Sequence, residues 1–182
     1  ILAHDYGDTV AQELLARQLD GTLPFKIHKV CMLNGGIFPE ATRPILMQRL
    51  LLSKLGPLIV KFSSYSRFAK SMRSICSVEL SEQHMQAHWQ TLIRAEGRSV
   101  MPKIIQYIRE RHQFRTRWLG ALQKAAIPLS LINGVDDPIS GINIVKRWRE
   151  LLPNTLVAEL ENVGHYPQWE VPEKVLFEVQ KF

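Results

Sequence analysis

The chain has 182 residues, of which 46% are hydrophobic and 22% are charged, and its formal net charge is +6. This length and composition suffice for one compact domain with room for a small appended one, and they exclude a disordered or fibrous protein. Charged residues interrupt every apolar stretch, so no segment reaches the roughly 20 apolar residues of a membrane-spanning helix. Cys31 and Cys76 have no CxxC spacing, which argues against a disulfide framework or a zinc site and favours a reducing compartment such as the cytoplasm.

Strands and helices are predicted to alternate at both ends of the chain. Residues 1–4 are expected to end a buried strand, residues 6–19 to form a helix, and residues 26–33 to form a second strand before the glycines of Asn34-Gly35-Gly36. Later in the chain the expected elements are a strand at 127–133, a helix at 142–152, a strand at 155–160 and a helix at 172–182. This alternation is typical of a parallel sheet with helices on its faces, which is an α/β fold.

The middle of the chain is predicted to be helical throughout. The expected helices cover residues 44–55, 57–75, 81–95 and 100–122. We therefore divide the chain into a core part at 1–41, a helical cap at 42–125 and a second core part at 126–182. The cap holds 15 Lys or Arg against 4 Asp or Glu, so the base excess of the chain lies there.

The first candidate for chemistry is Asp5, because the carboxyl ends of parallel strands hold the functional groups of an open sheet. In Ala3-His4-Asp5-Tyr6-Gly7, small residues stand two positions before and two positions after the aspartate. A nucleophile elbow requires them because its strained strand-to-helix turn brings those two backbones together. A carboxylate there suits displacement at saturated carbon, which gives an alkyl ester that water then cleaves. The alternative is that Asp5 only caps the following helix.

Two later loops supply partners for this nucleophile. Gly134-Val135-Asp136-Asp137 follows one predicted strand, and Gly164-His165-Tyr166 follows the last one. The order nucleophile, acid and histidine is that of α/β-hydrolase triads. We expect Asp137 to orient His165, with Asp136 serving the adjacent turn and His165 acting as the base. The alternative for His165 is a core histidine whose hydrogen bonds are satisfied.

These motifs resemble those of epoxide hydrolases and haloalkane dehalogenases. His4-Asp5-Tyr6-Gly7 resembles their H-D-W-G elbow, and Asp137 with Gly164-His165 matches their acid and histidine. The segments HDYGDTVAQELL, LNGGIFPE, FRTRWLGAL and HYPQWE are similar to the mesoderm-specific transcript branch of this family and its bacterial members. The resemblance covers the whole chain and implies the α/β-hydrolase fold with an inserted helical cap, in agreement with the helices at 42–125.

The resemblance also implies how an oxyanion would be held. Family members carry several strands and an HG-x-P loop before the elbow, and that loop supplies one oxyanion donor. The chain opens on Ile1 without an initiator methionine, so we expect these N-terminal strands to be missing from it. The other donor is expected to be the backbone N–H of Tyr6.

The residue types around the elbow favour an epoxide over a halide as the reacting group. Haloalkane dehalogenases hold the departing halide with an indole N–H after the nucleophile, and Tyr6 occupies that position here. Epoxide hydrolases protonate the opened ring with cap tyrosines, and Tyr107 resembles such a donor by its place before the strand at 127–133. Tyr65 is the weaker candidate for a second donor. The alternative for Tyr107 is packing at helical spacing.

Other features of the sequence predict binding partners or their absence. His84 and His88 have a spacing that can seat a metal, but no third ligand is apparent, so we predict neither a metal nor a cofactor. The expected partner is a small apolar substrate. A competing hypothesis is a non-catalytic interaction or peripheral membrane role, in which Arg109, Arg111, Arg115 and Arg117 with Phe114 and Trp118 contact anionic headgroups. No nucleic-acid recognition motif accompanies this charge.

Overall fold

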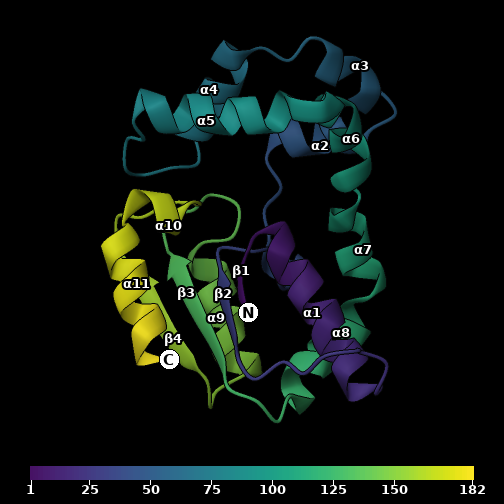
Figure 1. Cartoon of the computed structure of the whole chain (residues 1–182), viewed down its shortest axis with the longest axis vertical. Helices are drawn as coiled ribbons and strands as arrows, with labels where there is room; N and C mark the ends of the chain where they lie inside the picture. Colours follow the sequence, from purple (N-terminus) through teal and green to yellow (C-terminus); the bar gives the residue numbers. More distant parts are fainter.

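A four-stranded sheet lies at the centre of the computed structural model, which describes all 182 residues (Figure 1). Its strands are all parallel and follow the order β1 (Leu2–His4), β2 (Val30–Leu33), β3 (Leu129–Gly134) and β4 (Leu156–Leu160). Every residue of β2 and β3 is buried, as expected for central parallel strands that are covered on both faces. The predicted α/β class is confirmed.

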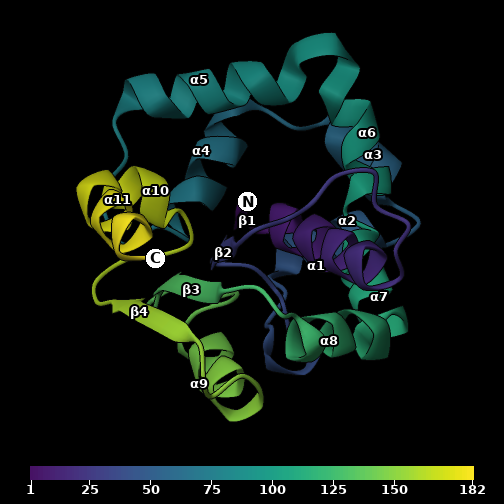
Figure 2. The same cartoon turned by 60° about the horizontal axis from the view of Figure 1, so that its bottom comes forward.

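Helices cover the two faces of this sheet. The apolar faces of α1 (Tyr6–Leu19), α8 (Arg115–Lys124) and α9 (Ile142–Leu151) share the larger hydrophobic core with the side chains on one face of the strands. On the other face, α11 (Pro172–Lys181) contributes to a smaller core. Figure 2 shows α9 and α11 on opposite sides of the sheet. The layers therefore follow the alternation of strand and helix along the chain.

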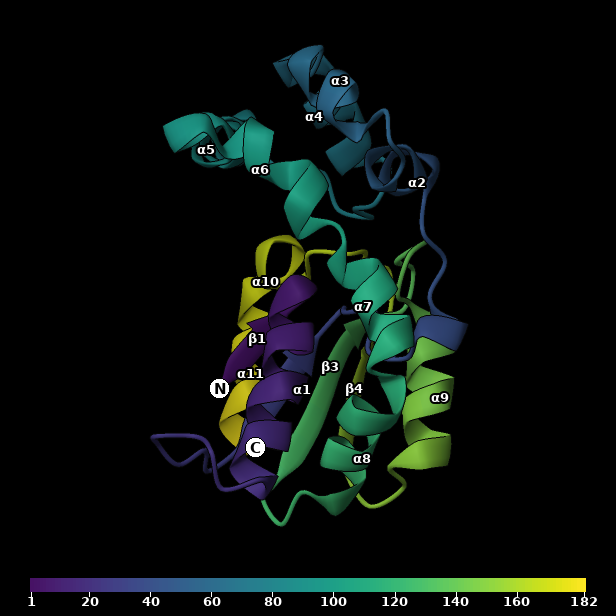
Figure 3. The same ribbon diagram turned by 90° about the vertical axis from the view of Figure 1, so that its right-hand side faces the viewer.

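A helical layer lies above the carboxyl ends of the strands (Figure 3). It consists of α2 (Leu46–Leu52), α3 (Gly56–Lys61), α4 (Tyr65–Arg73), α5 (Glu82–Ile93) and α6 (Gly97–Ile104). The helix α7 (Tyr107–Gln113) leads from this layer back down to α8 beside the sheet. Short 3-10 turns at Pro39–Ala41 and Arg94–Glu96, and the short helix α10 (Pro167–Glu170), complete the elements. No helix combines the length and the apolar character needed to span a membrane.

Several segments differ from the prediction, and the single helices expected at 57–75 and 100–122 are each divided into shorter helices. The second strand begins at Val30 and not at residue 26, because its neighbours β1 and β3 pair only with Val30–Leu33 and leave the earlier residues without a partner strand. The helix α8 falls within the predicted cap of 42–125 but packs beside the sheet on α1. Its buried residues Trp118, Ala121 and Leu122 recur at helical spacing and give α8 an apolar stripe, which must be buried away from water.

Candidate active site

Asp5 lies at the turn between β1 and α1 in a conformation that few residues adopt. Its φ is 49° and its ψ is −106°, and its side chain makes no capping hydrogen bond to α1. The alternative role as a helix cap is therefore not the one seen. A non-glycine residue in this region carries a strain of roughly 1–3 kcal/mol, which is characteristic of functional sites. The Asp5 side chain is 27% exposed and thus reachable by a small molecule.

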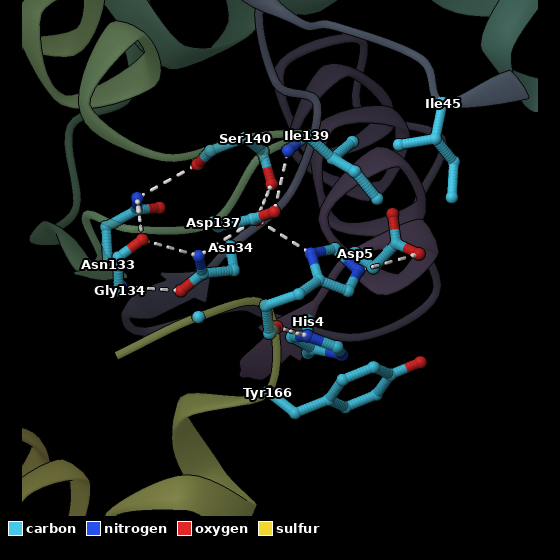
Figure 4. Close-up of polar contacts among 12 residues, drawn as sticks. His4, Asp5, Asn34, Ile45, Asn133, Gly134, Asp137, Ile139, Ser140 and Tyr166 are labelled. Atoms are coloured by element: carbon cyan, nitrogen blue, oxygen red, sulfur yellow. Dashed lines mark hydrogen bonds and ion pairs between the residues drawn. The ribbon is translucent and has the colours of Figure 1, made fainter. Parts of the chain in front are cut away.

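The structure brings Asp5, Asp137 and His165 together from three separate loops (Figure 4). The Nδ1 atom of His165 lies 2.7 Å from Oδ2 of Asp137, and its Nε2 atom lies 3.6 Å from Oδ2 of Asp5. The imidazole thus has one nitrogen bound to the buried acid and the other directed at the elbow. The neighbouring Asp136 is exposed, whereas Asp137 is buried and contacts His165, so of the two only Asp137 has the position expected of the predicted acid.

Asp137 is held by three further donors from its own loop and from β2. Ile139 N–H donates to its Oδ1 at 2.8 Å, and the Ser140 hydroxyl donates to its Oδ2 at 2.6 Å. The Nδ2 atom of Asn34, at the end of β2, donates to the same Oδ2 at 3.1 Å, while Asn34 Oδ1 accepts from Gly134 N–H at 2.7 Å. These bonds fix the carboxylate that orients the imidazole.

The charges of the three groups are strongly coupled. Burial alone would raise the pKa of Asp5, but the polar contact with His165 and the positive charges of His165 and Arg111 hold that pKa below its ordinary range. Burial alone would lower the pKa of His165, but the charges of Asp137 and Asp5 and its contacts with both carboxylates raise it. The two carboxylates therefore favour the protonated form of the imidazole between them.

Of the three candidate tyrosines, two lie at the elbow. The Tyr107 hydroxyl donates toward Asp5, at 3.2 Å from Oδ1 and 3.4 Å from Oδ2. Burial and the Asp5 carboxylate raise the pKa of Tyr107, so this hydroxyl keeps its proton. Tyr6 begins α1, where the first N–H groups have no partner within the helix, so its N–H is free to bind an oxyanion. Tyr65 is not brought to the site, because its hydroxyl donates to Glu82 within the cap.

The loop that carries His165 is held in place by residues that were not predicted to belong to the site. The side chain of His4 bonds from Nε2 to the His165 carbonyl oxygen at 2.7 Å, and the Tyr166 ring packs perpendicular to the His165 ring with centroids 5.0 Å apart. The Glu170 carboxylate accepts N–H bonds from Gly164, Tyr166, Ser77 and Val78. Glu170 thereby links the histidine loop to the segment between α4 and α5.

The remaining candidates have other surroundings. His84 and His88 pack against the Trp169 ring, and no group of three or more His, Cys, Asp or Glu side chains is arranged to hold a metal. Arg111 is buried beside Asp5, and Arg115 and Arg117 form ion pairs with Glu40, Glu13 and Asp20. The stretch proposed to contact headgroups is therefore largely engaged within the protein.

No protein-family model matches the chain, but several known proteins are similar to it in sequence. LipZ from Mycobacterium tuberculosis, a candidate hydrolase by its name, is 40% identical over 177 residues, which cover 95% of this chain and 61% of LipZ. The mesoderm-specific transcript homolog protein of Bos taurus is 37% identical and is covered over 53% of its length. The chain thus spans between half and two thirds of these relatives.

Solved structures resemble the whole of this chain. An alpha/beta hydrolase fold protein from Burkholderia ambifaria superposes with a TM-score of 0.76 at 16% identity, covering 100% of this chain and 65% of that one. The haloalkane dehalogenase DbeA from Bradyrhizobium elkanii, as a loop variant, superposes with a TM-score of 0.74 at 18% identity, covering 99% of this chain and 65% of that one. At these identities the likeness concerns the fold alone.

Proposed function

Since this chain has the α/β-hydrolase fold, we propose that it carries the catalytic groups of a hydrolase whose nucleophile is Asp5. The observation that carries the proposal is a carboxylate at a strained elbow, 3.6 Å from an imidazole whose other nitrogen is bound to a buried acid. A carboxylate attacks saturated carbon to give an ester, whereas its attack on acyl carbon would give only a reactive anhydride. We infer that the substrate has its leaving group on sp³ carbon.

An epoxide fits the surroundings of Asp5 better than other substrates of this kind. In the first step, an Asp5 oxygen bonds to one ring carbon while the carbon–oxygen bond of the ring breaks. The departing oxygen takes the proton of the Tyr107 hydroxyl, which is directed at Asp5 and is protonated at neutral pH. The products of this step are an alkyl ester on Asp5, a hydroxyl group on the other ring carbon of the substrate and a deprotonated Tyr107 oxygen.

The second step uses the pairing of His165 with Asp137. Formation of the ester removes the negative charge of Asp5, which is one of the two charges that raise the pKa of His165. The imidazolium then releases its proton more readily, and a proton returns to the Tyr107 oxygen. The neutral ring can then take a proton from water that attacks the ester carbonyl. The Tyr6 N–H is available to hold the oxyanion that forms. Collapse of this intermediate breaks the bond from the Asp5 carbonyl carbon to the ester oxygen. The departing oxygen takes the proton of the newly formed carboxyl group, which releases a diol and restores the Asp5 carboxylate.

The test is a substrate panel with the full-length protein. Terminal and internal epoxides, chloroalkanes, bromoalkanes and carboxylic esters should be compared at equal concentration. We expect diol formation from epoxides, with Asp5→Asn abolishing it. Halide release without diol formation would favour the dehalogenase alternative, and ester hydrolysis that survives Asp5→Asn would contradict the assignment of the nucleophile.

A further inference from the structure

Arg111 is a buried cation in direct contact with the elbow. Its side chain is 4% exposed, its Nε donates to the Thr9 hydroxyl at 2.8 Å, and its Nη2 donates to the main-chain carbonyl oxygen of Asp5 at 2.9 Å. The same Nη2 lies 3.6 Å from Oδ1 of the Asp5 carboxylate. Removing a guanidinium from water costs several kcal/mol unless its N–H groups find partners. The contacts of Arg111 with the elbow must therefore offset the free-energy cost of burying its charge.

The surrounding backbone is shaped to admit this side chain. A Cβ atom at Gly36 would collide with Nη1 of Arg111, and a Cβ atom at Gly35 would collide with the Asp8 carboxylate. The Tyr107 ring lies under the guanidinium, with its centroid 4.4 Å from Cζ. Tyr107 and Arg111 stand four residues apart on α7, so one face of this helix brings both to Asp5.

Asp8 adds a buried carboxyl group behind the elbow. It is fully buried on α1, and neither of its carboxylate oxygens has a hydrogen-bond partner. Burial raises the pKa of Asp8, and the positive charge of Arg111 acts against this rise. Arg111 pairs with the carboxylate of Asp5, and its charge also acts on Asp8, which lies three residues later in the first turn of α1.

We propose that Arg111 is a positioning residue for Asp5, which fixes the strained main chain of the elbow and sets a permanent positive charge beside the carboxylate. The proposal rests on Asp5 being the nucleophile. An arginine suits this role better than a lysine, because its planar fork can bind the Thr9 hydroxyl and the Asp5 carbonyl at once. Arg111 lies on α7, the helix that leads from the cap back to the core, so this helix supplies a contact that holds the elbow.

The ionisation of Asp5 provides a test that does not require turnover. The groups that face Asp5 are His4 from β1, His165 and Tyr166 from the histidine loop, Tyr107 and Arg111 from α7, and Asp8 from α1. Aspartate labelled with ¹³C at the carboxyl carbon, in the full-length protein, reports each titration, and the Asp5 signal is identified by its loss in Asp5→Asn. Arg111→Met and Arg111→Lys are compared with Arg117→Met, which removes an arginine from the surface.

We expect the Asp5 titration midpoint to rise by about one pH unit or more in Arg111→Met, because a cation that favours the carboxylate is lost. In Arg111→Lys, the titration midpoint of Asp5 should stay close to that of the parent protein. The rate of Asp5 alkylation by a reactive epoxide at neutral pH, where Asp5 is ionised in all variants, should fall roughly 10- to 100-fold in Arg111→Met and about tenfold in Arg111→Lys, because orientation is lost.

Arg117→Met should change neither quantity. A titration midpoint and an alkylation rate in Arg111→Met that equal those of Arg117→Met would overturn the proposal. If Arg111→Met does not fold, Arg111→Lys decides, and an unchanged alkylation rate in that variant overturns it. If no variant, including the parent, is alkylated, the proposed nucleophile fails, while the titration still shows whether Arg111 sets the ionisation of Asp5.

Discussion

At the scale of single residues, Tyr107 distinguishes an epoxide from a halide substrate. Tyr107→Phe removes the hydroxyl that donates to Asp5 but keeps the ring that packs on Tyr6 and under Arg111. Ring opening creates an alkoxide that needs a proton, so kcat/KM for an epoxide should fall by about 100-fold or more. Displacement of a halide needs no proton, so any turnover of a haloalkane should change little.

The matched control for this prediction is Tyr65→Phe, which removes a cap hydroxyl that bonds to Glu82 away from Asp5. Epoxide turnover should stay near the parent value in this variant. Equal losses on epoxide and haloalkane in Tyr107→Phe, or no loss on epoxide, would argue that Tyr107 only packs against the elbow.

The three proposed catalytic residues could be assigned to the site from the sequence, but the residues that support them could not. Asp5, Asp137 and His165 stand in motifs that can be recognised locally. Asn34 contacts Asp137, which lies 103 residues further along the chain, and nothing in the Asn34-Gly35-Gly36 turn indicates that partner. Arg111 was grouped with surface arginines because burial of a charge on a short helix leaves no periodic signal in the sequence.

At the scale of elements, Glu170 connects α10, the histidine loop and the segment between α4 and α5. Glu170→Gln replaces one carboxylate oxygen with an amide group, which has no acceptor for the N–H groups that now bond to it. We expect the free energy of unfolding to fall by roughly 1–3 kcal/mol. Protection of the amide hydrogens of residues 75–78 and 164–166 against exchange should fall as well.

Glu178→Gln is the control, because Glu178 pairs only with Lys181 at the surface of α11. Such a pair contributes about 0–1 kcal/mol, so this variant should behave as the parent in denaturant unfolding and in exchange. Unchanged amide protection in Glu170→Gln would mean that the histidine loop is held by other contacts.

Elements could be predicted where residues close together in the sequence determine them. They could not be predicted where contacts between distant segments determine them. The helix at 6–19 was predicted with the observed bounds, and all four strands were located. The single helix expected at 57–75 is two helices, because Ser64 caps the start of α4 and interrupts it. The place of α8 beside α1 depends on tertiary packing, which local spacing within residues 100–122 does not reveal.

At the scale of the whole molecule, the charge of the cap is divided unevenly. Residues 42–78 contain seven Lys or Arg and no Asp or Glu. The helix α3 lies far from the sheet in Figure 3, and Leu55, Leu58 and Phe62 around it are 58%, 52% and 63% exposed. If the cap contacts a membrane, we expect the full-length protein to bind anionic vesicles at low salt and to release them as salt screens the charge.

The variant Lys54→Glu/Lys61→Glu should weaken this binding, whereas Lys124→Glu/Lys146→Glu, with the same change in net charge on the core helices α8 and α9, should not. Vesicle sedimentation at several salt concentrations measures both. Equal binding to neutral vesicles, no binding to either kind, or equal effects of the two double variants would count against a membrane-facing cap.

The covalent intermediate tests the central claim most directly, because only a carboxylate nucleophile forms an ester with the substrate that a missing base leaves intact. In the full-length protein, His165→Gln should keep Asp5 able to attack carbon and remove the base that hydrolyses the ester. Mass spectrometry after mixing with a reactive epoxide should show the protein heavier by one substrate, with the adduct on the peptide that contains Asp5. Asp5→Ala should show no adduct. An active parent whose His165→Gln variant never accumulates this ester would contradict the account.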